Sequence, residues 1–160
     1  MSKETLKKSI REIPDFPIPG ILFYDVTTLF KNPEALSELS DILYETYKDK
    51  GITKVVGIES RGFIMGPMLA ARLGAGFVPI RKPGKLPAET ISAEYDLEYG
   101  TDKLEIHKDA IEAGKKVIIM DDLIATGGTL GASIELVEKL GGIVTKTACL
   151  IELEALKGIE

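Results

Sequence analysis

The sequence has no tryptophan, one cysteine, one histidine and no long apolar run. A lone cysteine, Cys149, excludes an internal disulfide, and the lack of about 18 consecutive apolar residues argues against a membrane-spanning helix. An excess of positive charge is also missing, because the formal net charge is -5 at pH 7. Binding to nucleic acid or to anionic membranes begins with electrostatic attraction, so neither partner is expected. These absences predict a soluble, cytoplasmic protein.

One segment of this acidic chain contains no acidic residue. Between Glu59 and Glu89 there is no aspartate or glutamate, whereas five basic residues occur there: Arg61, Arg72, Arg81, Lys82 and Lys85. Positive charge is thus concentrated in a short stretch. Such a stretch suits a small polyanionic ligand better than a long polymer.

The pattern of apolar residues predicts an α/β fold. With 160 residues and a hydrophobic fraction of 44%, a single domain over residues 1–160 is expected. The strand-like runs lack in-out alternation, which indicates a mainly parallel sheet covered by helices on both faces. Short apolar runs alternate with helical patterns at 55–58, 63–73, 77–80, 117–120, 129–140 and 143–151.

Three further segments lie outside this alternation. Apolar residues at helical spacing from Leu6 to Ile13 predict a short N-terminal helix. Residues 14–30 predict an extended arm stiffened by prolines, and Asn32-Pro33 predicts the start of another helix. Residues 84–106 combine proline, glycine and charge, and they predict a mobile flap over a binding site.

A glycine-containing turn follows the strand predicted at 117–120. It begins with two carboxylates, Asp121 and Asp122, and enters the next helix through Ala125-Thr126-Gly127-Gly128-Thr129. The glycines let backbone N–H groups surround an anion, and the helix N-terminus adds partial positive charge. Ligands of open α/β sheets bind beyond the carboxyl ends of strands, where adjacent aspartates suit ribose hydroxyls or a metal. The segment predicts a monophosphate site, and neither the Walker pattern nor the dinucleotide-binding glycine pattern occurs.

Residues 117–129 resemble the signature of the type I phosphoribosyltransferases, and the likeness extends over nearly the whole chain. The resemblance implies a type I phosphoribosyltransferase-like fold with a base-binding hood at 14–30 and the flap at 84–106. It also implies transfer of ribose 5-phosphate from phosphoribosyl pyrophosphate to a purine, with Mg²⁺ as cofactor. Further matching motifs are Pro14-Asp15-Phe16-Pro17, Glu59-Ser60-Arg61-Gly62-Phe63, residues 80–87 and residues 97–101.

The resemblance implies roles for individual residues as well. Asp121 and Asp122 would hold the ribose 2′- and 3′-hydroxyls and stabilise positive charge on the ring, while residues 125–129 would bind the 5′-phosphate. Glu98, beside Tyr99 in the flap, would relay a proton to N7 of the base. Mg²⁺ would bind mainly through phosphoribosyl pyrophosphate and pyrophosphate, without a dedicated protein ligand. The diphosphate would be bound by Glu59, Ser60, Arg61, Arg81, Lys82 and Lys85.

Adenine is the base that the resemblance favours, with AMP and pyrophosphate as products. Ala125 stands where related enzymes for 6-oxopurines commonly carry an aspartate. In the hood, Phe23 would stack on the base, while the C=O of Leu22 and the N–H of Tyr24 would read N6 and N1. Hypoxanthine would mismatch both backbone groups, and such a mismatch can be rejected by roughly 10⁴. The resemblance also implies a homodimer, in which the basic loop can reach a neighbouring subunit's site.

Two other functions are compatible with the ribose-phosphate loop alone. A phosphoribosyltransferase for hypoxanthine, guanine or xanthine is disfavoured by Ala125 and by the Phe23 hood. A regulator that senses the ribose ligand would need a nucleic-acid-binding element, for which the first ten residues are too short. Family members usually continue past 156–158 to an apolar strand, so the chain is either a short member or lacks that strand.

Overall fold

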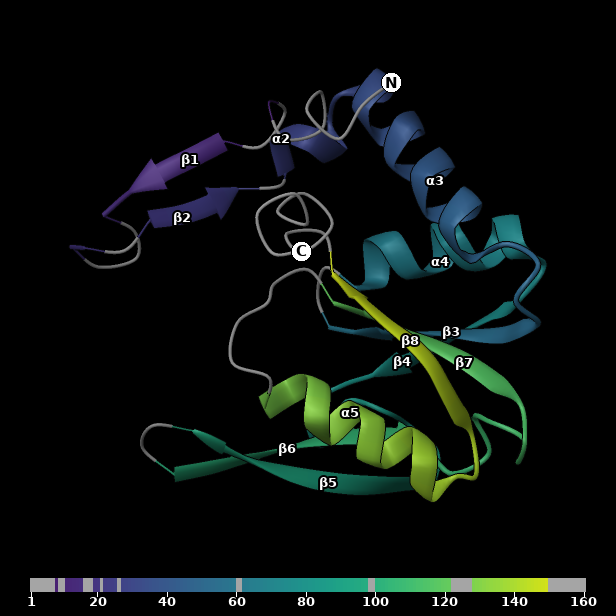
Figure 1. The fold of residues 1–160 in the computed structure, drawn as a ribbon. Coiled ribbons are helices and arrows are strands. Elements are labelled where there is room, and N and C mark those ends of the chain that lie inside the picture. The colour runs from purple at the N-terminus through teal and green to yellow at the C-terminus, as the bar shows by residue number, and fades with distance from the viewer. Residues whose placement is uncertain are drawn as a thin grey trace.

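A computed structural model describes residues 8, 11–15, 19–20, 22–25, 27–59, 62–97, 100–121 and 128–149, with only the backbone given for 22–25, 97, 121, 128–130 and 146–149. The fold is built around a parallel sheet with helices on both sides (Figure 1). Its elements in chain order are β1 (Arg11–Pro14), β2 (Leu22–Asp25), α2 (Thr27–Phe30), α3 (Pro33–Tyr47), β3 (Ile52–Ile58), α4 (Gly62–Leu73), β4 (Gly76–Ile80), β5 (Thr90–Leu97), β6 (Gly100–His107), β7 (Lys116–Asp121), α5 (Gly128–Lys139) and β8 (Ile143–Cys149).

The central sheet has the strand order β4-β3-β7-β8, and every neighbouring pair is parallel. Helix α4 connects β3 to β4, and α5 connects β7 to β8, as parallel pairing requires. The predicted α/β fold with a mainly parallel sheet is therefore confirmed. Within the described part of the chain, no helix has the length and apolar character needed to cross a membrane.

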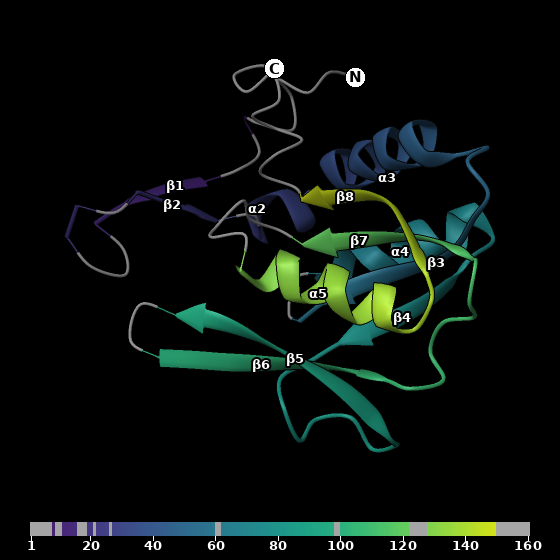
Figure 2. The same cartoon turned by 60° about the horizontal axis from the view of Figure 1, so that its bottom comes forward.

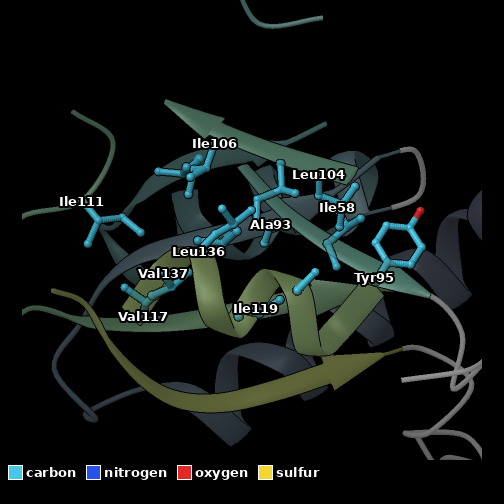
Figure 3. Close-up of a cluster of buried hydrophobic side chains, with 14 residues drawn as sticks. Ile58, Ala93, Tyr95, Leu104, Ile106, Ile111, Val117, Ile119, Leu136 and Val137 are labelled. Carbon is cyan, nitrogen blue, oxygen red and sulfur yellow. The ribbon is translucent and has the colours of Figure 1, made fainter. Parts of the chain in front are cut away.

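Two hydrophobic clusters cover the two faces of the sheet. Val55 and Ile118 point to one face, where they pack with α3 and α4. Their neighbours Val56 and Ile119 point to the other face, which α5 and the β5–β6 hairpin cover (Figures 2 and 3). All four residues are 0% exposed. Burial on both faces explains why these strands read as continuous apolar runs in the sequence.

The β5–β6 hairpin occupies most of the segment predicted as a flap. The two strands are antiparallel, and one face of the hairpin carries buried residues that pack against α5: Ala93, Tyr95, Leu104 and Ile106 (Figure 3). A backbone bridge between Arg81 and Glu105 joins the hairpin to the end of β4. The hairpin is thus part of the core at its base. Its movement over a ligand stays a prediction.

The N-terminal segment differs from the sequence prediction. Residues Arg11–Pro14 form strand β1 paired with β2, so the predicted helix is wrong in its last residues. Pro14 has no N–H and cannot continue a helix, whereas the backbone of Arg11–Pro14 can pair with β2. Lys8 is helical, and the other residues before Arg11 lie outside the described part. The extended arm predicted over 14–30 ends instead in the short helix α2, because Leu29 is fully buried against α3.

Helix α3 begins where the sequence indicates. Asn32 caps it, with its Oδ1 accepting hydrogen bonds from the N–H groups of Glu34 at 3.0 Å and Ala35 at 3.3 Å. Pro33 occupies the first turn, where its missing N–H does no harm. This cap fixes the start of the helix that closes one face of the sheet.

The turn between β3 and α4 depends on glycine. A Cβ atom at Gly57 would lie 2.5 Å from the carbonyl oxygen of Gly62, and one at Gly62 would lie 2.8 Å from the carbonyl oxygen of Met120. Only hydrogen fits at these two positions, so the start of α4 lies directly against β3 and β7. Residues 59–61, which the resemblance assigns to diphosphate binding, come between β3 and α4 in the sequence.

Candidate active site

Three strands bring predicted site residues to one edge of the sheet. Glu59 follows β3, Arg81 follows β4, and Asp121 is the last residue of β7. Strand β3 lies between β4 and β7, and all three are parallel, so their carboxyl ends meet. Helix α5 starts near this edge at Gly128, as the sequence predicts for a phosphate site (Figure 1). The basic residues after β4 and Asp121 at the end of β7 thus lie at the same edge of the sheet, on either side of β3.

The carboxylate of Glu59 accepts hydrogen bonds from the first two residues of the part of the basic segment that follows β4, residues 81–88. Its Oε1 accepts a hydrogen bond from the backbone N–H of Lys82 at 2.9 Å and one from Nε of Arg81 at 3.2 Å. The guanidinium of Arg81 also lies 5.5 Å from the ring centroid of Phe63, within cation–π range. The side chain of Glu59 therefore holds in place two residues that are predicted to bind diphosphate. Its own contact with a diphosphate stays a prediction.

The ammonium group of Lys82 lies between two acceptors on the hairpin. Its Nζ is 2.6 Å from the hydroxyl oxygen of Tyr95 and 2.5 Å from Oδ2 of Asp102. The Asp102 carboxylate, followed by the Tyr95 hydroxyl, raises the pKa of Lys82 above its ordinary value. The pKa of Asp102 is lowered, first by Lys82 and then by the backbone N–H of Lys103. Lys82 is therefore a cation at neutral pH, as anion binding requires.

Strand β6 holds the rest of the basic segment through its side chains. The N–H of Gly84 donates to Oε1 of Glu105 at 3.1 Å, and the N–H of Ala88 donates to Nε2 of His107 at 3.3 Å. Lys85, between the two contacts, is exposed. The segment is therefore anchored at both ends while its basic side chain faces solvent.

For the other residues predicted to lie in the site, either the structure gives only the backbone or they lie outside its described part. Backbone positions are given for Asp121, Gly128 and Thr129, and for residues 22–24 of the hood. In the extended strand β2, the C=O of Leu22 and the N–H of Tyr24 point to the same edge, since groups two residues apart share a side. The following lie outside the described residues: Ser60, Arg61, Glu98, Tyr99, Asp122, Ala125, Thr126 and Gly127.

Four hairpin residues that contact residues 81–88 were not identified as site residues from the sequence: Tyr95, Asp102, Glu105 and His107. The signal that could have found the hairpin is period-2 alternation. Ile91, Ala93 and Tyr95 alternate with polar residues, and the same pattern occurs at Leu104 and Ile106 after a glycine turn. Turn residues and charges around this pattern favoured a mobile flap, and the two strands were not predicted.

Comparison with known proteins agrees with this geometry. The family model described as "Phosphoribosyl transferase domain" matches residues 25–158. An adenine phosphoribosyltransferase of Bacteroides thetaiotaomicron is 69% identical over 158 residues, covering 99% of this chain and 90% of the relative. The crystal structure of adenine phosphoribosyltransferase from Thermoanaerobacter pseudethanolicus superposes with a TM-score of 0.89 at 51% identity, covering 99% of this chain and 94% of that chain.

A third similar structure was solved with ligands bound. The Saccharomyces cerevisiae adenine phosphoribosyltransferase, complexed with an imino-altritol bisphosphate and adenine, has a TM-score of 0.84 at 46% identity, covering 91% of this chain and 88% of that chain. The parallel α/β fold is thus shared with solved structures of enzymes of one class. The chain belongs to the phosphoribosyltransferase family and, within it, to the adenine phosphoribosyltransferases.

Proposed function

We propose that the protein transfers ribose 5-phosphate from phosphoribosyl pyrophosphate to adenine, giving AMP and pyrophosphate. One observation carries this proposal: the acidic end of β7 and the basic segment after β4 flank β3 at the same edge of the sheet. A substrate with a ribose at one end and a diphosphate at the other matches this division of charge. The reaction is the one named for relatives at 57–69% identity.

Asp121 and Asp122 would bind the ribose hydroxyls, and residues 125–129 would bind the 5′-phosphate at the N-terminus of α5. The N–H groups at a helix N-terminus, and those that glycine residues leave accessible, favour binding of an anion. Displacement at the anomeric carbon passes through a state in which positive charge develops on the ribose ring. The two carboxylates would stabilise that charge from a fixed position, so most of the catalysis would be positioning and electrostatic stabilisation.

Arg81, Lys82 and Lys85 would bind the leaving diphosphate, together with residues 59–61. The contacts of Arg81 and Lys82 with Glu59 support this role, because they orient both residues before a ligand arrives. Mg²⁺, when bound, would neutralise the diphosphate leaving group. Within the described residues, no group of three His, Cys, Asp or Glu side chains could hold a metal. As the resemblance to the family implies, phosphoribosyl pyrophosphate and pyrophosphate would supply most of its ligands.

The hood would select adenine through backbone groups. The C=O of Leu22 would accept from the N6 amino group, and the N–H of Tyr24 would donate to N1, with Phe23 stacked on the ring. The extended backbone of β2 supports this pairing, since it directs both groups to one edge. Glu98, which lies between β5 and β6 in the sequence, would relay the proton at N7. We also propose a homodimer in the cytoplasm, as the resemblance to the family implies.

The experiment is to incubate the protein with phosphoribosyl pyrophosphate, Mg²⁺ and adenine, and to quantify AMP and pyrophosphate by chromatography. The two products should appear in equal amounts and only when adenine is present. Release of pyrophosphate without AMP would contradict the proposed transfer. Binding of phosphoribosyl pyrophosphate without turnover of any base would favour the ligand-sensing regulator instead.

A further inference from the structure

A three-residue contact links the basic segment to both strands of the hairpin. Tyr95 on β5 and Asp102 on β6 are direct cross-strand partners. Lys82, which follows β4, reaches both, with Nζ at 2.6 Å from the Tyr95 hydroxyl and 2.5 Å from Oδ2 of Asp102. One ammonium group therefore ties the loop after β4 to both strands, close to the hairpin tip.

The two acceptors are themselves fixed. The Tyr95 side chain packs in the cluster between the sheet, α5 and the hairpin, and the residue is only 8% exposed (Figure 3). Asp102 accepts a second hydrogen bond at Oδ1, from the backbone N–H of Lys103 at 2.8 Å. Its Oδ2 also lies 3.4 Å from the Tyr95 hydroxyl. Lys82 thus meets acceptors whose positions are set by the hairpin and not by the lysine.

Lys82 is held at its backbone as well. Glu59 accepts the Lys82 N–H at 2.9 Å, so the residue is fixed at both ends of its side chain. A free lysine loses rotamer entropy when it is immobilised. Here that ordering happens before any ligand binds. The ammonium group has three donors, of which Tyr95 and Asp102 take two, and the side chain is 41% exposed, so a ligand can reach the third.

We propose that Asp102 is a positioning residue for the reaction: with Tyr95 it holds the ammonium group of Lys82 ready to donate to a diphosphate oxygen. This role depends on the proposed function, in which Lys82 binds the diphosphate. The contact also gives the hairpin a defined position, since the same ammonium group bridges both of its strands. Asp102 itself does not contact the reacting atoms. It acts on the reaction through Lys82.

The test is the isosteric variant Asp102→Asn, which keeps an acceptor for the Lys103 N–H and removes the charge that holds Lys82. We expect the KM for phosphoribosyl pyrophosphate to rise about two- to fivefold, as for loss of a partly exposed charge pair. Inhibition by pyrophosphate should weaken by a similar factor. The kcat and the KM for adenine should stay within about twofold of the wild-type values, because the base does not contact Lys82. Tyr95→Phe should give a smaller rise in the same direction.

Glu94→Gln is the matched control. Glu94 lies on the same hairpin, but its exposed carboxylate faces Lys103 at 3.9 Å and not the basic segment. This variant should leave all four constants unchanged. The effect of Asp102→Asn should also vanish in a Lys82→Ala background, where no ammonium group remains to be positioned. Thermal unfolding of each variant checks that the protein is folded.

Different outcomes test the positioning role of Asp102 and the proposed function separately. An unchanged KM for phosphoribosyl pyrophosphate in folded Asp102→Asn would overturn the positioning role. A lower KM would also overturn it, because Asp102 would then be competing with the diphosphate for Lys82. If Lys82→Ala itself left the KM for phosphoribosyl pyrophosphate unchanged, both the diphosphate role of Lys82 and the role of Asp102 would fail. Absence of turnover in the wild type would instead refute the proposed function.

Discussion

Gly57 is the position at which a single methyl group should perturb the fold most directly. It lies in β3, and a Cβ atom there would be 2.5 Å from the carbonyl oxygen of Gly62 and 2.7 Å from a ring carbon of Phe77. The Phe77 ring can rotate or shift. The Gly62 carbonyl belongs to the first residue of α4, so it cannot retreat unless the start of the helix moves.

The size of the effect follows from that contact. An ordinary carbon–oxygen approach is about 3.3 Å, so Gly57→Ala requires a backbone displacement of about 0.8 Å. Overpacking of this kind costs about 1–3 kcal/mol, and we expect the upper end because the contact is with backbone. For a domain of this size, about 3 kcal/mol lowers Tm by about 6–12 °C. Residues 59–61 follow directly, so the KM for phosphoribosyl pyrophosphate should rise as well.

Differential scanning fluorimetry and urea unfolding of Gly57→Ala measure the first effect, and steady-state kinetics measure the second. The control is Gly131→Ala on the exposed side of α5, where nothing lies within 4 Å of the added methyl group. That change should raise stability by about 0.5–1 kcal/mol, because alanine is the better helix former. A Tm for Gly57→Ala within about 2 °C of the wild type would refute the reasoning.

Three further predictions concern the core, the pH response and the metal. Leu39→Ala in α3 removes a fully buried side chain and should lower the free energy of unfolding by about 2–5 kcal/mol in urea titrations. The lowered pKa of Asp102 means that its contribution to stability is present above about pH 4 and is lost as the pH falls through that pKa. The Tm difference between wild type and Asp102→Asn should therefore shrink below about pH 4 and stay constant from about pH 5 to 9, since Lys82, with its raised pKa, remains charged. Removal of Mg²⁺ with EDTA should abolish AMP formation, and added Mg²⁺ should restore it; full activity in excess EDTA would contradict the proposed cofactor.

The parallel sheet was predictable from the sequence because its strands are buried on both faces. Val117 to Met120 are all 0% exposed, and a run of four apolar residues leaves few alternatives to a central strand. The start of α3 was also predictable, because Asn32 and Pro33 are local signals whose effect does not depend on distant residues.

Other features depend on contacts between residues far apart in the sequence. The spacing of Leu6 to Ile13 favoured a helix, but pairing with Leu22–Asp25 makes Arg11–Pro14 a strand. In the site, no local pattern indicates that Glu59 accepts the N–H of Lys82, or that Lys82 reaches Asp102. The sheet topology brings these residues together, so only the structure reveals that the basic segment is pre-ordered.

The measurement that tests the central claim most directly is the rate of pyrophosphate release with adenine, hypoxanthine, guanine and xanthine, compared side by side under identical conditions. We expect a kcat/KM for adenine that exceeds each 6-oxopurine value by roughly 10⁴, because the proposed pairing of the Leu22 and Tyr24 backbone groups with N6 and N1 fits adenine alone. Equal or faster turnover of any 6-oxopurine would contradict it.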